Sequence, residues 1–190
     1  MIYYVVKYSG TFGFIKPWTA VRDLETFSQQ FLTPSIVEGI EKKLFPELLQ
    51  HRGISKIVRH KLSYAGVNPQ QETIQAKAWK KSNKMYQREK AVLIRGVLLY
   101  PSLLLAFARE EDAQRAACQH ICLCRNEDLL FPDNEIMEMC EDEFNRLDGY
   151  ELRFGESDKA FMVGYNQYDD NSPMYGAIEI TGTPIRKEYV

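Results

Sequence analysis

Apolar and β-branched residues occur in short runs along the chain, and the spacing within each run predicts a strand or a helix. Residues 2–9, IYYVVKYS, are rich in β-branched and aromatic types, as expected of a strand. Residues 33–35, TPS, favour a helix start, because proline is tolerated where its missing N–H is not needed. Apolar residues then recur at helical spacing up to Leu48. We therefore expect a helix over about residues 34–50, which Pro46 bends or closes early.

The middle of the chain alternates between the same two kinds of pattern. Residues 54–64 alternate apolar and polar positions, as a half-buried strand does. A long apolar run at 91–108 predicts another strand, with a bend at its proline. Residues 110–124 predict a second helix with acids in its first turn, where the helix dipole favours them. A further short strand is expected at 128–131 or 135–140.

The order of these elements predicts the fold class. Strand, helix, strand, strand, helix, strand is the βαββαβ order of the ferredoxin-like or RRM arrangement, an α+β fold with helices on one face of a four-stranded sheet. A long basic insertion, residues 65–90, separates the second and third strands. Strands near 150–154, 160–166 and 176–181 predict a small C-terminal β extension. We therefore expect an RRM-like domain over residues 1–140 and the extension over 141–190.

Composition fits this picture of one globular domain. The chain has 190 residues, of which 45% are hydrophobic and 26% charged, so it can bury a core and wholesale disorder is not expected. No apolar run reaches the ~20 residues that a membrane helix needs, and the first residues do not form a signal peptide. These features predict a cytoplasmic protein that does not contact a membrane.

Charge is distributed unevenly between the two halves of the sequence. Residues 1–100 carry 16 Lys and Arg against 7 Asp and Glu, whereas residues 101–190 carry 8 against 19. Opposite faces of opposite sign follow if the halves do not interleave. The basic excess is concentrated in residues 51–95, with 11 Lys and Arg against Glu72 and Glu89. Such a field attracts phosphate, although a solvated face is the simpler interpretation of charge alone.

The sequence carries no strong catalytic or metal-binding signature. A P-loop, a dinucleotide fingerprint, HExxH and G-x-S-x-G are all absent from it. Four cysteines lie in the second half, and their spacing is not that of a zinc knuckle, so buried structural thiols are expected rather than a metal site: Cys118, Cys122, Cys124 and Cys140. The acidic run EIMEMCEDEF at 135–144 is interpreted as a solvated helical face rather than a magnesium site. We predict no cofactor, no metal and no catalytic residue.

Cations and aromatic rings are interleaved in the insertion. Single-stranded nucleic acid requires this mixture, because cations meet phosphates and flat rings stack on exposed bases. The candidate RNA-binding residues of the insertion are Lys77, Trp79, Lys80, Lys81, Lys84 and Arg88, with Tyr86 and Lys90 beside them. The alternative is a mobile basic loop with one aromatic residue in the core.

A similar mixture follows the first strand. Lys16, Trp18 and Arg22 lie in the segment that leads to the first helix. Thr33 and Ser35 open that helix, and a helix N-terminus offers free N–H groups to a phosphate. The alternative is an ordinary loop and helix cap.

At these residues the chain resembles the fifth family of CRISPR-associated proteins. This is the RAMP-type subunit that caps the 5′ end of the CRISPR RNA in type I Cascade complexes, an antiviral defence system. The resemblance lies in SGTFGFIKPWTAVR (9–22) and TFSQQFLTPSIVEGI (26–40), with weaker similarity in GISKIVRHKLSY (53–64) and VLIRGVLLYPSLLLAF (92–107). The long insertion occurs where that family carries its thumb hairpin.

The resemblance implies an RRM-like domain that holds the 5′ handle of the crRNA, with a thumb inserted between bases. It also implies the backbone and large subunits of Cascade as partners, and target DNA indirectly. In one branch of the family the protein also cuts the precursor RNA, using a tyrosine after the first helix with a lysine and a histidine downstream. Phe45 stands where that tyrosine would fall, and no obvious Lys-His pair follows the third strand. A non-catalytic binding role is therefore expected.

Two other interpretations remain open from the sequence. The first is a metal-independent endoribonuclease that matures precursor crRNA, with His51 or His60 as its base. The second is a protein-interaction domain without RNA, in which the basic segment pairs with the acidic half. In the RNA-binding interpretation, we expect the insertion at 65–90 to be mobile in the free protein and ordered against RNA in the complex.

Overall fold

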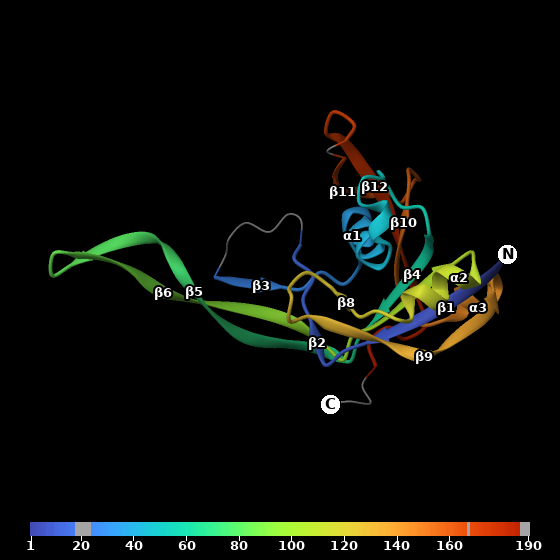
Figure 1. The fold of residues 1–190 in the computed structure, drawn as a ribbon, viewed down its shortest axis with the longest axis horizontal. Helices are drawn as coiled ribbons and strands as arrows, with labels where there is room; N and C mark the ends of the chain where they lie inside the picture. Colours follow the sequence, from blue (N-terminus) through green and yellow to red (C-terminus); the bar gives the residue numbers. More distant parts are fainter. Residues whose placement is uncertain (18–23, 167, 187–190) are drawn as a thin grey trace.

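The protein is an α+β fold built on a mostly antiparallel eight-stranded sheet (Figure 1). The computed structural model describes residues 1–17, 24–166 and 168–186, without the side chains of 75–78, 82 and 89. The strand order is β11-β12-β10-β4-β7-β1-β9-β8. In chain order these strands are β1 (Ile2–Ser9), β4 (Ile57–Ser63), β7 (Ser102–Phe107), β8 (Ile121–Cys122), β9 (Leu129–Cys140), β10 (Gly149–Phe154), β11 (Phe161–Asn166) and β12 (Ser172–Thr181).

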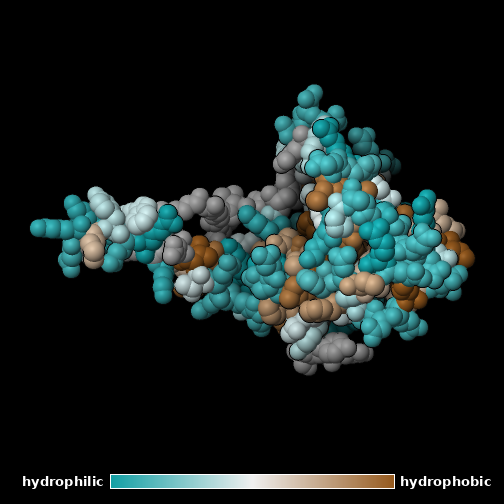
Figure 2. All heavy atoms as spheres, viewed as in Figure 1, coloured by the Kyte–Doolittle hydropathy of each residue, from teal (hydrophilic) through white to brown (hydrophobic). Residues whose placement is uncertain are grey.

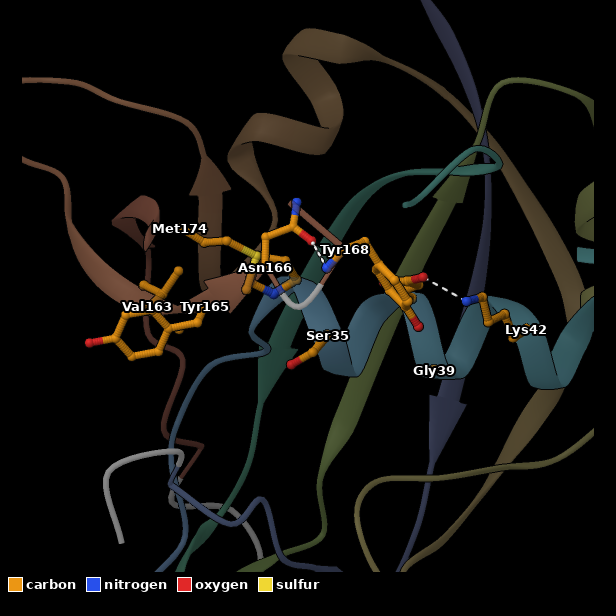
Figure 3. A pocket seen from close by; sticks show the side chains of 11 residues that line it. Ser35, Gly39, Lys42, Val163, Tyr165, Asn166, Tyr168 and Met174 are labelled. Carbon is orange, nitrogen blue, oxygen red and sulfur yellow. Dashed lines mark hydrogen bonds and ion pairs between the residues drawn. The ribbon is translucent and has the colours of Figure 1, made fainter. Parts of the chain in front are cut away.

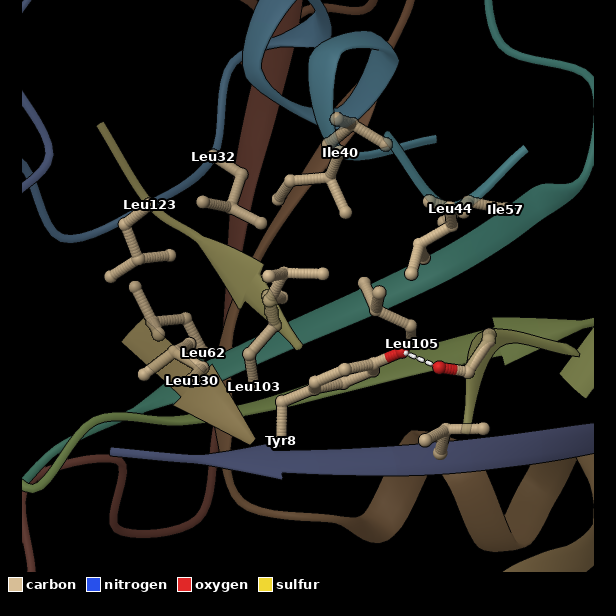
Figure 4. Packing of buried hydrophobic residues seen from close by; sticks show 14 of the residues in the cluster. Tyr8, Leu32, Ile40, Leu44, Ile57, Leu62, Leu103, Leu105, Leu123 and Leu130 are labelled. Carbon is tan, nitrogen blue, oxygen red and sulfur yellow. Dashed lines mark hydrogen bonds between the residues drawn. The ribbon is translucent and has the colours of Figure 1, made fainter. Parts of the chain in front are cut away.

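The main core lies between this sheet and two helices. Helix α1 (Pro34–Leu44), followed by the short 3₁₀ helix η1 (Pro46–Leu48), and helix α2 (Glu110–Ala116) pack on the same face. Leucine and isoleucine side chains from α1 meet those of β4 and β7 there (Figure 4). The buried Tyr8 hydroxyl donates a hydrogen bond of 2.6 Å to the Ala116 carbonyl, which ties β1 to the end of α2.

A smaller cluster covers the opposite face of the sheet. Tyr3 and Val5 of β1 pack there against Phe144 of α3 (Glu141–Arg146). Two cations of β4 lie beside the Phe144 ring: Arg59, which is paired with the buried Glu151, and Lys61, which donates hydrogen bonds to two backbone carbonyls. Alternate residues of β1 and β4 therefore serve two cores, as the period of two in a strand requires.

Several expected elements are confirmed at their expected positions. Strand β1 spans residues 2–9, and α1 begins at Pro34 and ends before Pro46. The two alternatives for the fourth strand, 128–131 and 135–140, are parts of one strand, β9. The strands expected near the C-terminus are present as β10, β11 and β12, and they extend the main sheet from β4 rather than forming a sheet of their own.

The second helix is shorter than expected. It ends at Ala116, and Ile121 and Cys122 form β8. From Ile121 to Cys124 the side chains alternate between buried and more exposed, which is a strand pattern that helical counting over 110–124 overlooks. The acidic run at 135–144 is likewise divided, because residues 135–140 belong to β9 and α3 begins at Glu141.

The expectation of buried thiols is wrong. Cys118, Cys124 and Cys140 are exposed and Cys122 is half-buried, and all four are free thiols. Their spacing argued against a zinc knuckle but does not determine burial, and three of the four side chains face solvent. Among the described residues, no group of three or more His, Cys, Asp or Glu side chains could hold a metal ion. No helix in the described part of the chain is long and apolar enough to cross a membrane.

The two halves of the sequence interleave in the body of the protein. Strands β1 and β4 from the basic half alternate with β7 and β9 from the acidic half. Ion pairs join the halves across this arrangement: Lys7 with Asp133, Glu47 with Arg115, Lys56 with Asp112, and Arg59 with Glu151. The body is therefore not divided into a basic and an acidic face, and the basic excess that remains is in the insertion.

Candidate nucleic-acid interface

The insertion is a long two-stranded hairpin that projects from the body (Figure 1). Its strands are β5 (Gly66–Ser82) and β6 (Met85–Leu99), so it extends nine residues beyond the expected end at residue 90. Residues 91–99, expected in the third sheet strand, belong to the hairpin. A turn at Tyr100 and Pro101 separates β6 from β7. Seven Lys and Arg residues stand against two Glu in the hairpin, and its outer part is mostly hydrophilic (Figure 2).

A tight two-residue turn closes the hairpin at Asn83 and Lys84. Both residues have positive φ, 47° and 67°, as the turn type that matches strand twist requires. Asparagine tolerates this backbone conformation, whereas lysine adopts it at a cost. The turn therefore places a lysine side chain at the far end of the hairpin, where it is exposed.

Cross-strand register gathers two rings and two cations on one face near this turn. Trp79 lies opposite Arg88, and Lys81 lies opposite Tyr86. Directly opposed residues of an antiparallel pair share a face, and so do residues two apart along one strand. These four side chains therefore form one surface, which we call the tip face.

The tip face is exposed and partly organised. The Trp79 side chain is 59% exposed and that of Tyr86 is 65% exposed, so neither ring is tucked into the core. The guanidinium carbon of Arg88 lies 4.8 Å from the centre of the Trp79 ring, a cation–π distance. The tip face thus has flat rings that can stack on bases, beside cations that can pair with phosphates. Proteins bind single-stranded nucleic acid through this combination.

A bulge sets the register of the tip. Below it Gln75 pairs with Lys90, and above it Trp79 pairs with Arg88, so β5 uses four residue steps where β6 uses two. Because side chains alternate along a strand and both numbers of steps are even, the Gln75–Lys90 and Trp79–Arg88 pairs lie on the same side of the ribbon.

The other expected hairpin residues surround the tip face. Lys80 lies opposite Gln87 and so points to the other side of the ribbon, and Lys84 occupies the turn. Lys77 belongs to β5, but its side chain is outside the described part of the structure. The structure therefore brings Trp79, Lys80, Lys81, Lys84 and Arg88 together at one end of the hairpin.

The residues expected near the first helix are not part of this tip. Lys16 is exposed in the segment after β2 (Phe12–Gly13), and Trp18 and Arg22 lie outside the described residues. Thr33 is buried, and its hydroxyl is 3.1 Å from that of Ser35.

Ser35 is exposed on the body of the protein. It lines a cavity of about 460 Å³ between α1 and the β11–β12 hairpin (Figure 3). Lys42 lies in the same cavity and is paired with Glu38 at 2.6 Å. The start of α1 is therefore a second location, separate from the hairpin tip.

The base of the hairpin is anchored by contacts that sequence patterns did not reveal. Strand β3 (Glu25–Phe27) pairs in parallel with β6, and the Phe27 ring packs directly against Gly96. Phe14 is buried beside two guanidinium groups, those of Arg95 at 5.8 Å and Arg125 at 5.4 Å. The hairpin is therefore held firmly at its base, while its outer part extends as two strands.

The surroundings of His60, His51 and Phe45 decide whether these side chains could take part in RNA cleavage. His60 is 4% exposed, and burial lowers the pKa of its imidazole to about 4. Its ring stacks on Phe154 at 5.6 Å, and its Nε2 has no hydrogen-bond partner among the described residues. His51 is exposed, and Phe45 is fully buried against Phe107. A shielded, neutral His60 is poorly placed to take a proton from a substrate.

Comparison with known proteins identifies a structural relative. No protein-family model matches the sequence, and no curated protein matches it significantly. A solved chain described as a "CRISPR RNA-guided surveillance complex" superposes with a TM-score of 0.52 at 11% sequence identity. The match covers 96% of this chain and 91% of the solved chain. The protein therefore shares its fold, over nearly its whole length, with a chain of a CRISPR RNA-guided surveillance complex.

Proposed function

We propose that this protein is a non-catalytic RNA-binding subunit of a type I CRISPR surveillance complex and caps the 5′ handle of the crRNA. The observation that carries the proposal is the tip face, where Trp79 and Arg88 stand beside Tyr86 and Lys81 on an exposed hairpin. The rings stack on unpaired bases and the cations neutralise phosphates. The partners in this proposal are crRNA and the backbone and large subunits, with target DNA as an indirect partner.

The topology of the body supports a ferredoxin-like assignment within this proposal. Strands β4, β7, β1 and β9 are neighbours in that order, and α1 and α2 connect β1 to β4 and β7 to β9. Helices on one face of a four-stranded antiparallel sheet are the RRM arrangement. In this proposal residues 1–140 form the RAMP-type domain, the hairpin is its thumb, and residues 141–190 are an extension of its sheet.

The absence of catalysis in the proposal rests on two side chains. Phe45 has no hydroxyl and is buried, so it cannot supply the proton transfers of a tyrosine. His60 is enclosed by β4, β10 and the Phe154 ring, and burial favours its neutral form. The endoribonuclease alternative would therefore require His51, which is exposed.

The test is to purify the protein with its assembled complex and to sequence the bound RNA. The proposal expects crRNA whose 5′ handle is protected from nuclease by this subunit. Protection should be lost when Trp79, Tyr86 and Arg88 are all replaced by alanine. Protein neighbours without bound RNA would instead support the protein-interaction alternative and would refute the proposal.

A further inference from the structure

A second aromatic site lies at the base of the hairpin, far from the tip. A hollow of about 420 Å³ is lined there by three rings from separate chain segments: Phe12 of β2, Tyr100 of the turn between β6 and β7, and Phe131 of β9. Tyr100 is 43% exposed and Phe131 is 57% exposed. Large aromatic side chains that remain this exposed around one hollow gain little from burial within the chain.

The backbone at Tyr100 adopts a conformation that is strained for an aromatic residue. Its φ of 46° lies in the left-handed region, which is uncommon for an aromatic residue. The following residue is Pro101, which further restricts the residue before it. Glycine or asparagine would adopt this backbone at lower cost. Such outliers concentrate at functional sites, where the surrounding structure holds them in place.

Backbone hydrogen bonds hold this turn against the loop that leads to β2. The Tyr100 N–H donates to the Thr11 carbonyl at 2.9 Å, and the Gly10 N–H donates to the Pro101 carbonyl at 3.1 Å. A Cβ on Gly10 would lie 2.5 Å from the Leu129 carbonyl oxygen, so the loop also lies close to the start of β9. The Tyr100 ring is therefore presented at the hollow from a clamped backbone rather than from a free loop.

The polar lining indicates what kind of flat ligand the hollow takes. Glu127 contributes an exposed carboxylate, with one oxygen 3.5 Å from Nε of Arg125. A carboxylate accepts two hydrogen bonds at once from adjacent N–H donors. Among the four RNA bases, guanine presents two such donors side by side, its N1–H and its N2 amino group. Thr11, a residue with a hydroxyl group, also lines the hollow.

We infer that this hollow binds one unstacked base of the RNA, with guanine preferred through Glu127. The inference rests on the proposed RNA-binding function and adds a second, base-reading contact to it. Tyr86 at the tip and Leu99 at the base of β6 are thirteen residues apart. At ~3.3 Å per residue, the tip and the hollow are separated by about 40 Å along the strand and contact different nucleotides.

The decisive variant is Tyr100→Asn, because asparagine tolerates the left-handed backbone while removing the ring. We expect RNA binding to weaken about 5- to 150-fold, the range for loss of one base stack, and the thermal midpoint to stay unchanged or rise. Phe131→Thr, which removes the ring and places a β-branched residue of high strand propensity in β9, is the second variant and should also weaken binding. If both variants fold and bind RNA like the parent, the hollow is not a base site.

Modified RNA separates this site from the tip. The RNA that co-purifies with the complex is synthesised with a single abasic nucleotide at each position in turn. The parent should lose affinity at one position that Tyr100→Asn no longer senses, and at another that Trp79→Ala no longer senses. At the first position, replacing guanine by inosine should weaken the parent but not Glu127→Gln, because inosine lacks the N2 amino group.

The outcomes distinguish a failure of the base site in the hollow from a failure of RNA binding by the protein. If Trp79→Ala loses affinity and Tyr100→Asn does not, the hollow is refuted while RNA binding stands. If the parent itself does not bind this RNA, the proposed function fails and the hollow with it. Coincidence of the Tyr100 and Trp79 positions on the RNA would also overturn the inference, because the two rings lie at opposite ends of the hairpin.

Discussion

Charge and stacking at the hairpin tip can be separated by a salt titration. Replacing Lys80, Lys81 and Lys84 together by alanine removes three exposed cations around the turn and leaves the Trp79–Arg88 pair intact. If each lysine meets one phosphate, its loss reduces the slope of log affinity against log salt by ~0.7 for a single strand. The triple variant should therefore flatten the slope by about 2, with weaker binding at low salt.

Trp79→Ala should behave differently. The ring is 59% exposed, so its removal costs the fold little, but one base loses its stacking surface. An affinity loss of ~1–3 kcal/mol is expected, with nearly the parent's salt slope, because stacking releases no counterions. Fluorescence anisotropy with labelled handle RNA at several salt concentrations measures both quantities.

A matched control comes from the body of the protein. Lys159→Ala removes an exposed lysine between β10 and β11, away from the hairpin, and should change neither affinity nor slope. If the triple variant and Trp79→Ala both bind like the parent, the hairpin is only a solvated arm. The tip face would then not support the proposed function.

Three further predictions concern stability and catalysis. The pKa of His60 is about 4 in the folded state against 6.5 as its ordinary value, so its contribution to stability is fully present above pH 6.5 and is lost as pH falls through 4. This difference in pKa corresponds to ~3 kcal/mol of unfolding free energy. Denaturant unfolding of His60→Leu from pH 3 to 8 should show a weaker loss of stability in acid and a gain of ~1 kcal/mol at neutral pH. If the loss of stability in acid is the same as in the parent, His60 is not a neutral buried imidazole. Lys84→Gly relieves a positive φ of 67° and should strengthen the hairpin by ~1 kcal/mol, seen as slower hydrogen exchange of β5 and β6 amides, whereas unchanged exchange would mean that the turn carries no strain. Purified protein in EDTA should leave repeat RNA uncut, and site-specific cutting abolished by His51→Ala or His60→Ala would instead establish the endoribonuclease.

Local sequence patterns predicted the elements whose ends are marked by prolines or whose composition is typical of a strand. The start and end of α1 follow from Pro34 and Pro46, and β1 follows from its β-branched run. The division of residues 91–108 could not be obtained in this way, because both pieces are rich in leucine. Leu98 is buried near the hairpin base and Leu103 in the main sheet, and the backbone reverses between them at Tyr100. Periodicity does not report which strand a residue pairs with.

The candidate site also depends on strand pairing, which the sequence pattern does not give. Composition indicated that cations and rings in the insertion suit RNA, and those residues do gather at the hairpin tip. Their grouping into one face depends on the register above the bulge, which sequence spacing alone does not give. The hollow around Tyr100 was missed altogether, because its three rings come from distant segments. The YP dipeptide at 100–101, a turn signal inside an apolar run, was the available clue.

The bulge in β5 has a consequence for how the hairpin can vary in length. A bulge absorbs extra residues of one strand, so removing one residue from 76–78 would leave a smaller bulge with Trp79 still opposite Arg88 and Lys81 still opposite Tyr86. Removing two residues would preserve the facing and simply straighten the ribbon. Extending both strands by two residues would likewise keep the facing and carry the tip ~7 Å farther out. The reach of the arm can therefore change while the side on which it meets its ligand stays the same, provided that both strands change length in steps of two.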